Sequence, residues 1–241
     1  MDSKRGVEVY HSAENQSAHY GNLMMCGSVW TCPVCAAKIT EKRKAELGDA
    51  LVAHQDEYKY YMGTFTMSHK VGDKLSDLLG AVNDAFRKMK MGRAWLSIKA
   101  RYGIVGYITA LEVTYGVNGW HVHKHTLFVC SRLLSGPEVA QFQNELYQRF
   151  DKGLRKFGFH TSAAYGVEVK QSDKRDQLEY LGKWGMASEL TKALIKKGRA
   201  GGLNPWQMLE AISLGADSYR PMFIEYANEF KGKRQLVWSD G

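Results

Sequence analysis

Three histidines occupy every second position in the segment His121-Val-His123-Lys-His125, and apolar residues continue this segment to Cys130. In an extended strand, side chains alternate between the two faces of a sheet, so all three imidazoles project from one face. Neighbouring imidazoles add little to packing, but together they form a ready site for a divalent metal ion. The alternative, a half-buried strand with its histidines toward water, explains one histidine better than three. The spacing therefore predicts a metal site on a strand.

An acidic residue, Glu112, precedes the histidines and is separated from them by a segment with the pattern of a tight turn. The segment 115–119 has the glycine and asparagine residues of a tight turn, so it folds Glu112 back near the level of His121 or His123, depending on the register. A carboxylate with imidazoles suits Mn²⁺, Mg²⁺ or Co²⁺ and leaves positions open for substrate oxygens. We therefore expect a Lewis-acid centre, and the alternative is a glutamate at the solvent edge.

A candidate nucleophile lies in a segment with helical spacing. Asp176, Tyr180 and Lys183 share one face of a helix that begins near residue 174. The phenol has an ordinary pKa near ~10 and needs a cation or metal ion nearby to attack as phenolate. An ordinary amphipathic helix is the alternative, and the histidine strand in the same chain favours the chemical interpretation.

Three of the four cysteines lie close together, as Cys26, Cys32 and Cys35. In a chain without secretory features, such a cluster favours zinc thiolates over disulfides, and a Cys-Pro-Val-Cys turn directs two sulfurs at one ion. A closed structural site needs a fourth ligand, for which His11 and His19 are the neighbouring candidates and His19 is nearer. We expect Cys130 to be a buried thiol in the hydrophobic core.

The chain has 241 residues and a formal net charge of +8, which favours a polyanionic partner. One basic group is interleaved with aromatic residues and contains no intervening acid, which is typical of nucleic-acid contacts; solvated helix faces are the alternative. Its members are Arg87, Lys88, Lys90, Arg93, Lys99 and Arg101. No apolar run is long enough to span a bilayer and no leader opens the sequence, so we expect a cytoplasmic protein without a membrane partner.

Periodicity divides the chain into a zinc-binding segment with a helix, residues 1–55, and a catalytic domain with C-terminal helices, residues 56–241. Strands are expected at 58–67, 104–114, 121–130 and 163–170, and helices at 36–53, 74–91, 137–157, 174–197 and 205–214. This order predicts an α+β fold with a central, mainly antiparallel sheet flanked by helices. Residues 1–35 are expected to depend on metal binding rather than on a hydrophobic core.

These motifs together resemble the plasmid rolling-circle replication initiators of the HUH endonuclease superfamily. The resemblance is to the branch with an N-terminal cysteine segment, found in plasmids of Gram-positive bacteria and actinomycetes, and it covers nearly the whole chain. The matching segments are 26–38, 64–67, 111–114, 119–125, 166–169, 180–185, 204–206 and 232–239.

The resemblance implies an HUH/RRM-like palm that nicks and rejoins a single DNA strand through a covalent 5′-phosphotyrosine intermediate. His123 and His125 match the metal-binding pair, with His121 as an extra neighbour and Glu112 as an acidic third ligand. Tyr180 matches the tyrosine that attacks the phosphodiester. Lys183 would then lie close to the phosphate or the metal. The implied cofactors are catalytic Mn²⁺ or Mg²⁺ beside structural Zn²⁺, and the implied partners are single-stranded or hairpin origin DNA and a host helicase.

Two departures from the family pattern matter. Trp184 stands where phage relatives carry a second tyrosine, which implies a single-tyrosine mechanism. Asp176 stands where plasmid relatives often carry a glutamate that activates water for the terminating cleavage, and Glu179 and Glu189 compete for that role.

Other functions use parts of the same constellation. They are an HUH nickase that serves transposition or mobilisation, a zinc-containing nucleic-acid-binding module without catalysis, and a zinc hydrolase that uses metal-bound water.

Overall fold

The computed structural model describes residues 6–14, 16–22, 25–171 and 202–239, without the side chain of His19. The elements in chain order are β1 (Glu8–Ser12), β2 (Ser17–Gly21), α1 (Pro33–Ala53), β3 (Lys59–Thr66), α2 (Leu75–Met89), α3 (Gly92–Tyr102), β4 (Ile104–Gly116), β5 (Gly119–Cys130), α4 (Gly136–Leu154), β6 (Val167–Gln171), α7 (Pro205–Ser213), α8 (Arg220–Phe230) and β7 (Leu236–Trp238). Short 3₁₀ turns follow α4 and precede α8.

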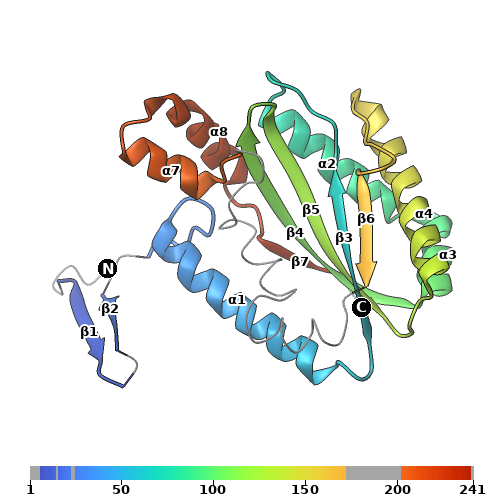
Figure 1. Cartoon of the computed structure of the whole chain (residues 1–241), viewed down its shortest axis with the longest axis horizontal. Coiled ribbons are helices and arrows are strands. Elements are labelled where there is room, and N and C mark those ends of the chain that lie inside the picture. Colours follow the sequence, from blue (N-terminus) through green and yellow to red (C-terminus); the bar gives the residue numbers. More distant parts are fainter. Residues whose placement is uncertain (1–5, 15, 23–24, 172–201, 240–241) are drawn as a thin grey trace.

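The central sheet has five strands in the order β6-β3-β5-β4-β7, and each neighbouring pair is antiparallel. Helices lie against both of its faces (Figure 1). The expected α+β fold with an antiparallel sheet is therefore confirmed. The histidine strand β5 lies in the middle of the sheet, between β3 and β4, so its side chains have neighbours on both sides.

The hairpin of β4 and β5 is longer and tighter than its sequence pattern indicated. The strands stay paired as far as Gly116 and Gly119, which leaves a two-residue turn of Val117 and Asn118. Gly119 has φ +84°, a conformation that side chains with a Cβ rarely adopt, and a Cβ there would lie 3.2 Å from the backbone oxygen of Lys70. This turn fixes the register of every residue pair between the two strands.

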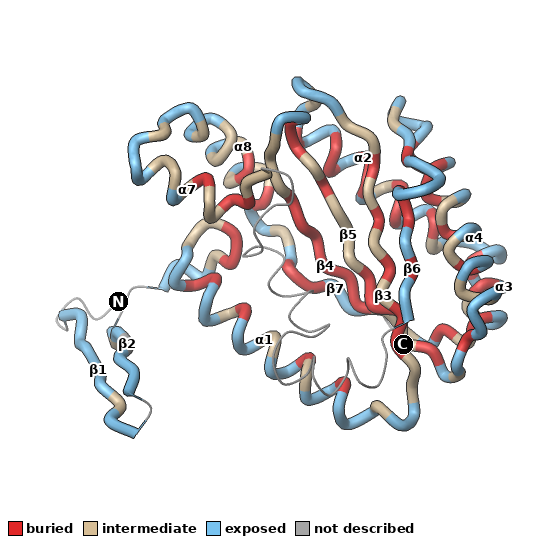
Figure 2. The backbone as a smooth tube through the Cα atoms, in the orientation of Figure 1, coloured by how far each residue is buried: buried red, intermediate tan, exposed pale blue. Residues whose placement is uncertain are grey.

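One face of the sheet carries the larger hydrophobic core, which α2, α3 and α4 cover (Figure 2). Phe65, Phe128 and Phe150 are fully buried in it. Helices α2 and α4 approach closely because Gly153 faces Ala85, where an added Cβ would lie only 2.7 Å from the Ala85 Cα.

In the described part of the chain, the opposite face is only partly covered. Helix α1 packs Leu47 and Leu51 against Tyr60, Ile108 and Leu127 in a second, smaller core. Leu127 follows the three histidines along β5 and faces the same side of the sheet. The histidines therefore lie beyond the small core that α1 makes with Leu127.

The N-terminal region is not held by metal binding alone, so that expectation is wrong for two residues. Val29 and Trp30 are buried in the larger core. The Trp30 ring packs edge-on against Phe230 with 4.7 Å between centroids, and its Nε1 donates to the backbone oxygen of Lys233 at 2.6 Å. The β1–β2 hairpin, by contrast, projects away from the sheet and is mostly exposed (Figures 1 and 2).

Several elements have no counterpart in the sequence-based expectation, namely the β1–β2 hairpin, α3, α8 and β7. Helix α3 buries only Trp95, Ile98 and Tyr102 in a stretch dominated by basic residues, which hides its periodicity. Strand β7 has three residues and exists through its pairing with β4. The division of the chain at residue 55 stays a prediction. Within the described ranges, no helix combines the length and apolar character that crossing a bilayer requires.

Candidate functional site

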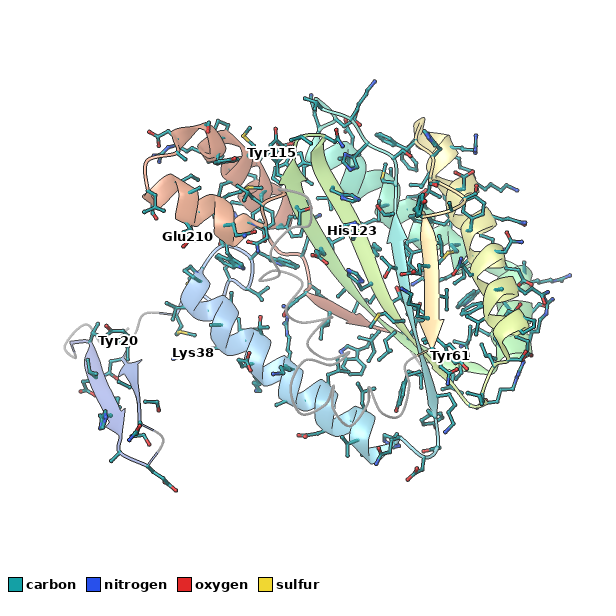
Figure 3. The ribbon with its side chains drawn as sticks, in the orientation of Figure 1. Tyr20, Lys38, Tyr61, Tyr115, His123 and Glu210 are labelled. Atoms are coloured by element: carbon teal, nitrogen blue, oxygen red, sulfur yellow. The ribbon has the colours of Figure 1, made fainter. Side chains whose placement is uncertain are left out.

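The imidazoles of β5 form a row on the partly covered face of the sheet. The rings of His121 and His123 lie 3.9 Å apart between centroids, and those of His123 and His125 lie 6.2 Å apart. The residues between them, Val122 and Lys124, belong to the other face, as the alternation of a strand requires. Figure 3 marks His123 on β5, between β3 and β4.

Glu112 joins this row from the neighbouring strand. The hairpin register pairs its Cα with that of His123, which decides between the two registers that the sequence allowed. Its Oε2 atom lies 2.9 Å from Nε2 of His125, the diagonal neighbour. Glu112 is 9% exposed, so the carboxylate lies in the sheet and not at its solvent edge.

Two threonines of β3 contact the same imidazoles from the other side. The Thr64 hydroxyl lies 3.3 Å from Nδ1 of His125, and the Thr66 hydroxyl lies 2.8 Å from Nε2 of His121. A hydrogen bond to one ring nitrogen fixes the orientation of the ring and leaves the other nitrogen for a metal ion or a second partner. The segment 64–67, one of those that carry the resemblance, therefore lies beside the candidate centre.

His69 is a fourth imidazole that the sequence analysis missed. Its ring lies 4.6 Å from that of His121, and its Nδ1 donates to the backbone oxygen of Asn118 at 3.0 Å. It lies three residues after β3, outside any strand, so no periodicity marks it. Its place after the Thr-Phe-Thr-Met motif was the signal available in the sequence.

Burial keeps the imidazoles of His121 and His123 neutral. Loss of hydration, followed by the nearby His69, lowers the pKa of His121 to about 4, with Glu112 acting in the opposite direction. Loss of hydration and then the adjacent His121, His125 and His69 hold the pKa of His123 well below its usual range. Neutral rings have a free lone pair, which is the state that binds a metal ion.

Glu112, His123 and His125 offer the types of ligand atom that bind a divalent ion, but these atoms lie too far apart to contact one ion together. Ligand atoms lie roughly 2 Å from such an ion, and hence no more than roughly 4 Å from each other. Among the described residues, only the cysteine cluster has three ligand atoms within 4.8 Å of one another. An ion shared by Glu112, His123 and His125 therefore requires one of these side chains to change rotamer.

That cysteine cluster lies at the N-terminus of α1. Cys32 is the N-cap, and its sulfur accepts a hydrogen bond from the backbone nitrogen of Cys35 at 3.4 Å, while the Cys26 and Cys35 sulfurs are 3.6 Å apart. Burial acts to raise the pKa of Cys35, but hydrogen bonds from Cys32 and the Gly27 backbone outweigh it and lower that pKa. The three thiols are placed as three zinc ligands would be.

The fourth zinc ligand is not identified. His11 is exposed on β1, and the side chain of His19 is outside the described part of the chain. Cys130 is buried in the larger core, as expected, and burial raises the pKa of its thiol to about 12. It is a packing residue with no access to the cluster.

The predicted nucleophile and its neighbours lie outside the described residues. Tyr180, Asp176 and Lys183 fall within 172–201, as do the alternatives Glu179 and Glu189. Their roles stay predictions.

The basic group of residues 87–101 divides into cations with and without an acidic partner. Arg87 and Lys88 both pair with Asp84 at 2.6 Å, and Arg101 pairs with Glu145. Among the described residues, Arg93 and Lys99 have no ion pair. Helices α2 and α3 cover the face opposite the histidines. A DNA strand that contacts both this basic group and the histidines therefore has to pass an edge of the sheet. The DNA-binding role of this group stays a prediction.

A comparison with known protein families decides the relationship of this chain. The model of the family described as replication protein, Rep_1, matches residues 20–239. The chain belongs to the Rep_1 family. The expected kinship with replication initiators is thereby confirmed at the level of the family.

Two relatives of this Rep_1 protein come from Streptomyces. "Protein rep" of Streptomyces lividans is 28% identical over 306 aligned positions, which cover 99% of this chain and 67% of the relative. The "Neomycin resistance protein" of Streptomyces cyanogenus is 31% identical over 153 positions, covering 53% of this chain and 35% of that protein. The chain thus spans about two thirds of the first relative and about one third of the second. No solved structure matches this chain.

Proposed function

We propose that this Rep_1 protein initiates rolling-circle replication of an actinomycete-type plasmid by nicking and rejoining one strand of its origin DNA. The observation that carries the proposal is the contact of the Glu112 carboxylate with His125, beside neutral His123, on the central strand of the sheet. Membership of a replication protein family and a net charge of +8 agree with a DNA substrate.

In the proposed reaction, the Tyr180 phenol oxygen attacks the phosphorus of the scissile phosphodiester. A phosphorus–oxygen bond to tyrosine forms, the bond to the 3′ oxygen breaks, and that oxygen takes up a proton to become a 3′ hydroxyl. The phenol must lose its own proton, and a nearby cation such as Lys183 favours the phenolate. The phosphotyrosine keeps the bond energy, so the strand can later be resealed.

The residues of the sheet have a positioning role in this scheme. His123, His125 and Glu112 would hold the ion, while Thr64 and Thr66 set the orientation of the rings. A bound Mn²⁺ or Mg²⁺ supplies a Lewis acid that neutralises charge on the non-bridging oxygens and on the leaving 3′ oxygen. Zn²⁺ at Cys26, Cys32 and Cys35 would be structural.

The test uses a randomised single-stranded DNA library, so that no origin sequence has to be known in advance. Protein, Mn²⁺ and DNA labelled at its 3′ end are combined and run on a denaturing gel. Attack that forms a 5′-phosphotyrosine leaves the 3′ fragment on the protein, so a labelled protein band is expected, whereas 5′-labelled DNA gives none. Sequencing the linked DNA then reports the cleavage site.

Two pairs of variants make this test specific. Tyr180→Phe is expected to remove the band, and Tyr20→Phe, at an exposed tyrosine of β2, to keep it. His123→Ala is expected to reduce the band by at least about 100-fold, the scale seen when transition-state charge stabilisation is lost, while His54→Ala at the exposed end of α1 has no effect. Salt-sensitive DNA binding should survive in all four variants.

The remaining outcomes point to the other candidate functions. DNA binding without any labelled band, whatever the metal, indicates a zinc-containing binding module without catalysis. Cleavage that survives Tyr180→Phe indicates a hydrolase that uses metal-bound water. An origin-like hairpin in the recovered DNA supports replication, and the ends of a mobile element support transposition. Recruitment of a host helicase stays a prediction.

A further inference from the structure

A cavity of about 280 Å³ lies on the face of the sheet opposite the histidines. It is bounded by the C-terminal half of α2, the α2–α3 connection and the strands β4, β5 and β7. Its lining includes Phe86, Arg87, Lys90, Tyr107, Thr109 and Lys124. We call it the lysine cavity, and none of its lining residues is an acid.

Two ammonium groups point into apolar surroundings in this cavity. Nζ of Lys90 lies 4.0 Å from the centroid of the Phe86 ring and 3.9 Å from that of Tyr107. Nζ of Lys124 lies 5.0 Å from the Phe86 ring. Both lysine residues are half-buried, and both ammonium groups lie near the Phe86 ring.

Neither ammonium has an anionic partner among the described residues. Within the ranges that the structure describes, no carboxylate lies at ion-pair distance from Lys90 or Lys124 and neither Nζ donates a hydrogen bond. Lys88 and Arg87, on the same helix, share the carboxylate of Asp84 instead. Within the described residues, the positive charge of the cavity is therefore uncompensated, although Asp84 on the same helix pairs with Arg87 and Lys88.

Such an arrangement is unfavourable unless a ligand completes it. Contacts with ring faces offset only part of the cost of removing an ammonium from water. Burial, followed by the nearby charge of Lys124, lowers the pKa of Lys90 to about 7. An anion placed between the two nitrogens would pair with both, and Arg87 and the Thr109 hydroxyl lie in the same lining.

We propose that the lysine cavity binds a phosphate group, with the ammoniums of Lys90 and Lys124 as its main contacts. The site is separate from the histidine row and its occupancy does not depend on nicking. The phosphate can come from free phosphate or a nucleotide, or from the backbone of a bound DNA strand. Lys90 thus contributes to this cavity, and not to the exposed basic surface in which its sequence position placed it.

Calorimetry on the full chain tests the proposal without divalent metal or DNA. Inorganic phosphate is titrated into the protein at constant ionic strength. A parallel titration with chloride controls for general salt effects. Lys90→Met/Lys124→Met is expected to weaken phosphate binding by at least about tenfold, because each charge-assisted hydrogen bond contributes on that scale. Lys152→Met, at an exposed lysine of α4, should bind phosphate as the wild type does.

The unfolding temperature tests separately whether the two lysine charges lack a partner in the free protein. Without ligand, the double variant should unfold at a higher temperature than the wild type, because methionine fills the same space without an uncompensated charge. Lys90→Met alone serves if the double variant does not fold. Equal phosphate affinity in the variants and the wild type, or no binding heat in the wild type, overturns the proposal.

A second titration distinguishes the two sources of phosphate. If the cavity holds the backbone of DNA, saturation with single-stranded oligothymidylate abolishes the heat of phosphate binding. If it holds a free anion, the heat persists and deoxythymidine monophosphate competes. Failure of these titrations leaves the covalent-adduct experiment unaffected, so the two proposals can fail independently.

Discussion

At the scale of single residues, the pair Glu112–His125 is distinguished by where it lies. Its side chains are 12% and 14% exposed, with 2.9 Å between the oxygen and the ring nitrogen. The pair Glu57–His54 contains the same two residue types at 3.2 Å, but its side chains are 59% and 55% exposed. Water screens the exposed pair, whereas a buried carboxylate beside an imidazole keeps its attraction for a cation.

This contrast provides a matched experiment on metal binding. Glu112→Gln keeps the size of the side chain but removes its charge, so Mn²⁺ affinity should fall by at least about tenfold, and covalent-adduct formation with it. Glu57→Gln should change neither. Electron paramagnetic resonance of free Mn²⁺ measures the affinity, and equal affinity in both variants would exclude Glu112 from the ligand set.

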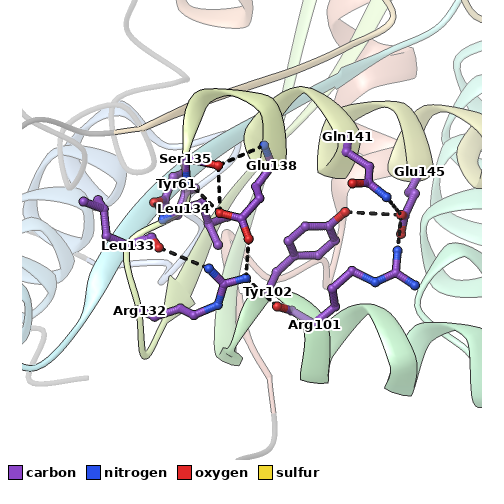
Figure 4. A network of polar contacts seen from close by, with 10 residues as sticks. All are labelled: Tyr61, Arg101, Tyr102, Arg132, Leu133, Leu134, Ser135, Glu138, Gln141 and Glu145. Carbon is purple, nitrogen blue, oxygen red and sulfur yellow. Dashed lines mark hydrogen bonds and ion pairs between the residues drawn. The ribbon is translucent and has the colours of Figure 1, made fainter.

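At the scale of elements, the start of α4 is joined to the sheet by a polar network (Figure 4). Ser135 and Glu138 form a capping box, in which the Glu138 carboxylate accepts from the Ser135 backbone nitrogen at 2.8 Å. Arg132 donates to the same carboxylate at 2.7 Å. The backbone nitrogen of Leu134 donates to the Tyr61 hydroxyl at 2.7 Å, which connects the segment to β3. The network fixes how the chain leaves β5.

The hydrogen bond from Arg132, followed by those from Ser135, lowers the pKa of Glu138 to about 2. A carboxyl whose pKa is depressed on folding stabilises the protein above its unfolded value of ~4.3 and loses that effect as the pH falls through the folded value. Glu138→Gln should therefore lower the unfolding temperature at pH 7.

The difference between Glu138→Gln and the wild type should shrink between pH 4 and pH 2, where the wild-type carboxyl takes up its proton. Thermal unfolding followed by circular dichroism checks this. Glu46→Gln, on the exposed face of α1, is the control and should have little effect at any pH. A constant difference across the whole pH range would mean that Glu138 acts through packing alone.

At the scale of the whole molecule, the segment that leads into α1 and the helix itself contact the C-terminal segment 230–235. Trp30 contacts Phe230 and the Lys233 backbone, and Nη1 of Arg43 donates to the Gln235 side chain at 2.7 Å. The cysteine cluster lies at the start of α1, next to these contacts. A zinc ion there would fix the N-terminus of α1, and thereby the helix that packs on the face of the sheet that carries the histidines.

Zinc removal should therefore loosen one region and leave the sheet folded. Purified protein is expected to contain one zinc ion per chain, and Cys32→Ser/Cys35→Ser to contain none, with Cys130→Ala as the matched control that keeps it. Hydrogen exchange should quicken in residues 25–40 of the double variant and stay unchanged in β3 and β5. Full zinc content in the double variant would refute the assignment.

Local backbone geometry determined the part of this protein that its sequence could predict. The alternation at His121, His123 and His125 required one shared face because strand geometry has a period of two. The Cys-Pro-Val-Cys turn likewise brought Cys32 and Cys35 together through their short spacing in the chain. Helix α3 escaped prediction because its buried residues are few and its basic residues many.

Tertiary packing decided what depends on residues far apart in the chain. The two-residue turn set Glu112 opposite His123, and the pairing of β3 with β5 brought in Thr64 and Thr66. The position of His69 beside His121, and the turning of Lys90 into a cavity, follow from how loops and helices settle on the sheet. A periodic pattern reports the direction of a side chain within its own element, whereas its partners are selected by the packing of distant segments.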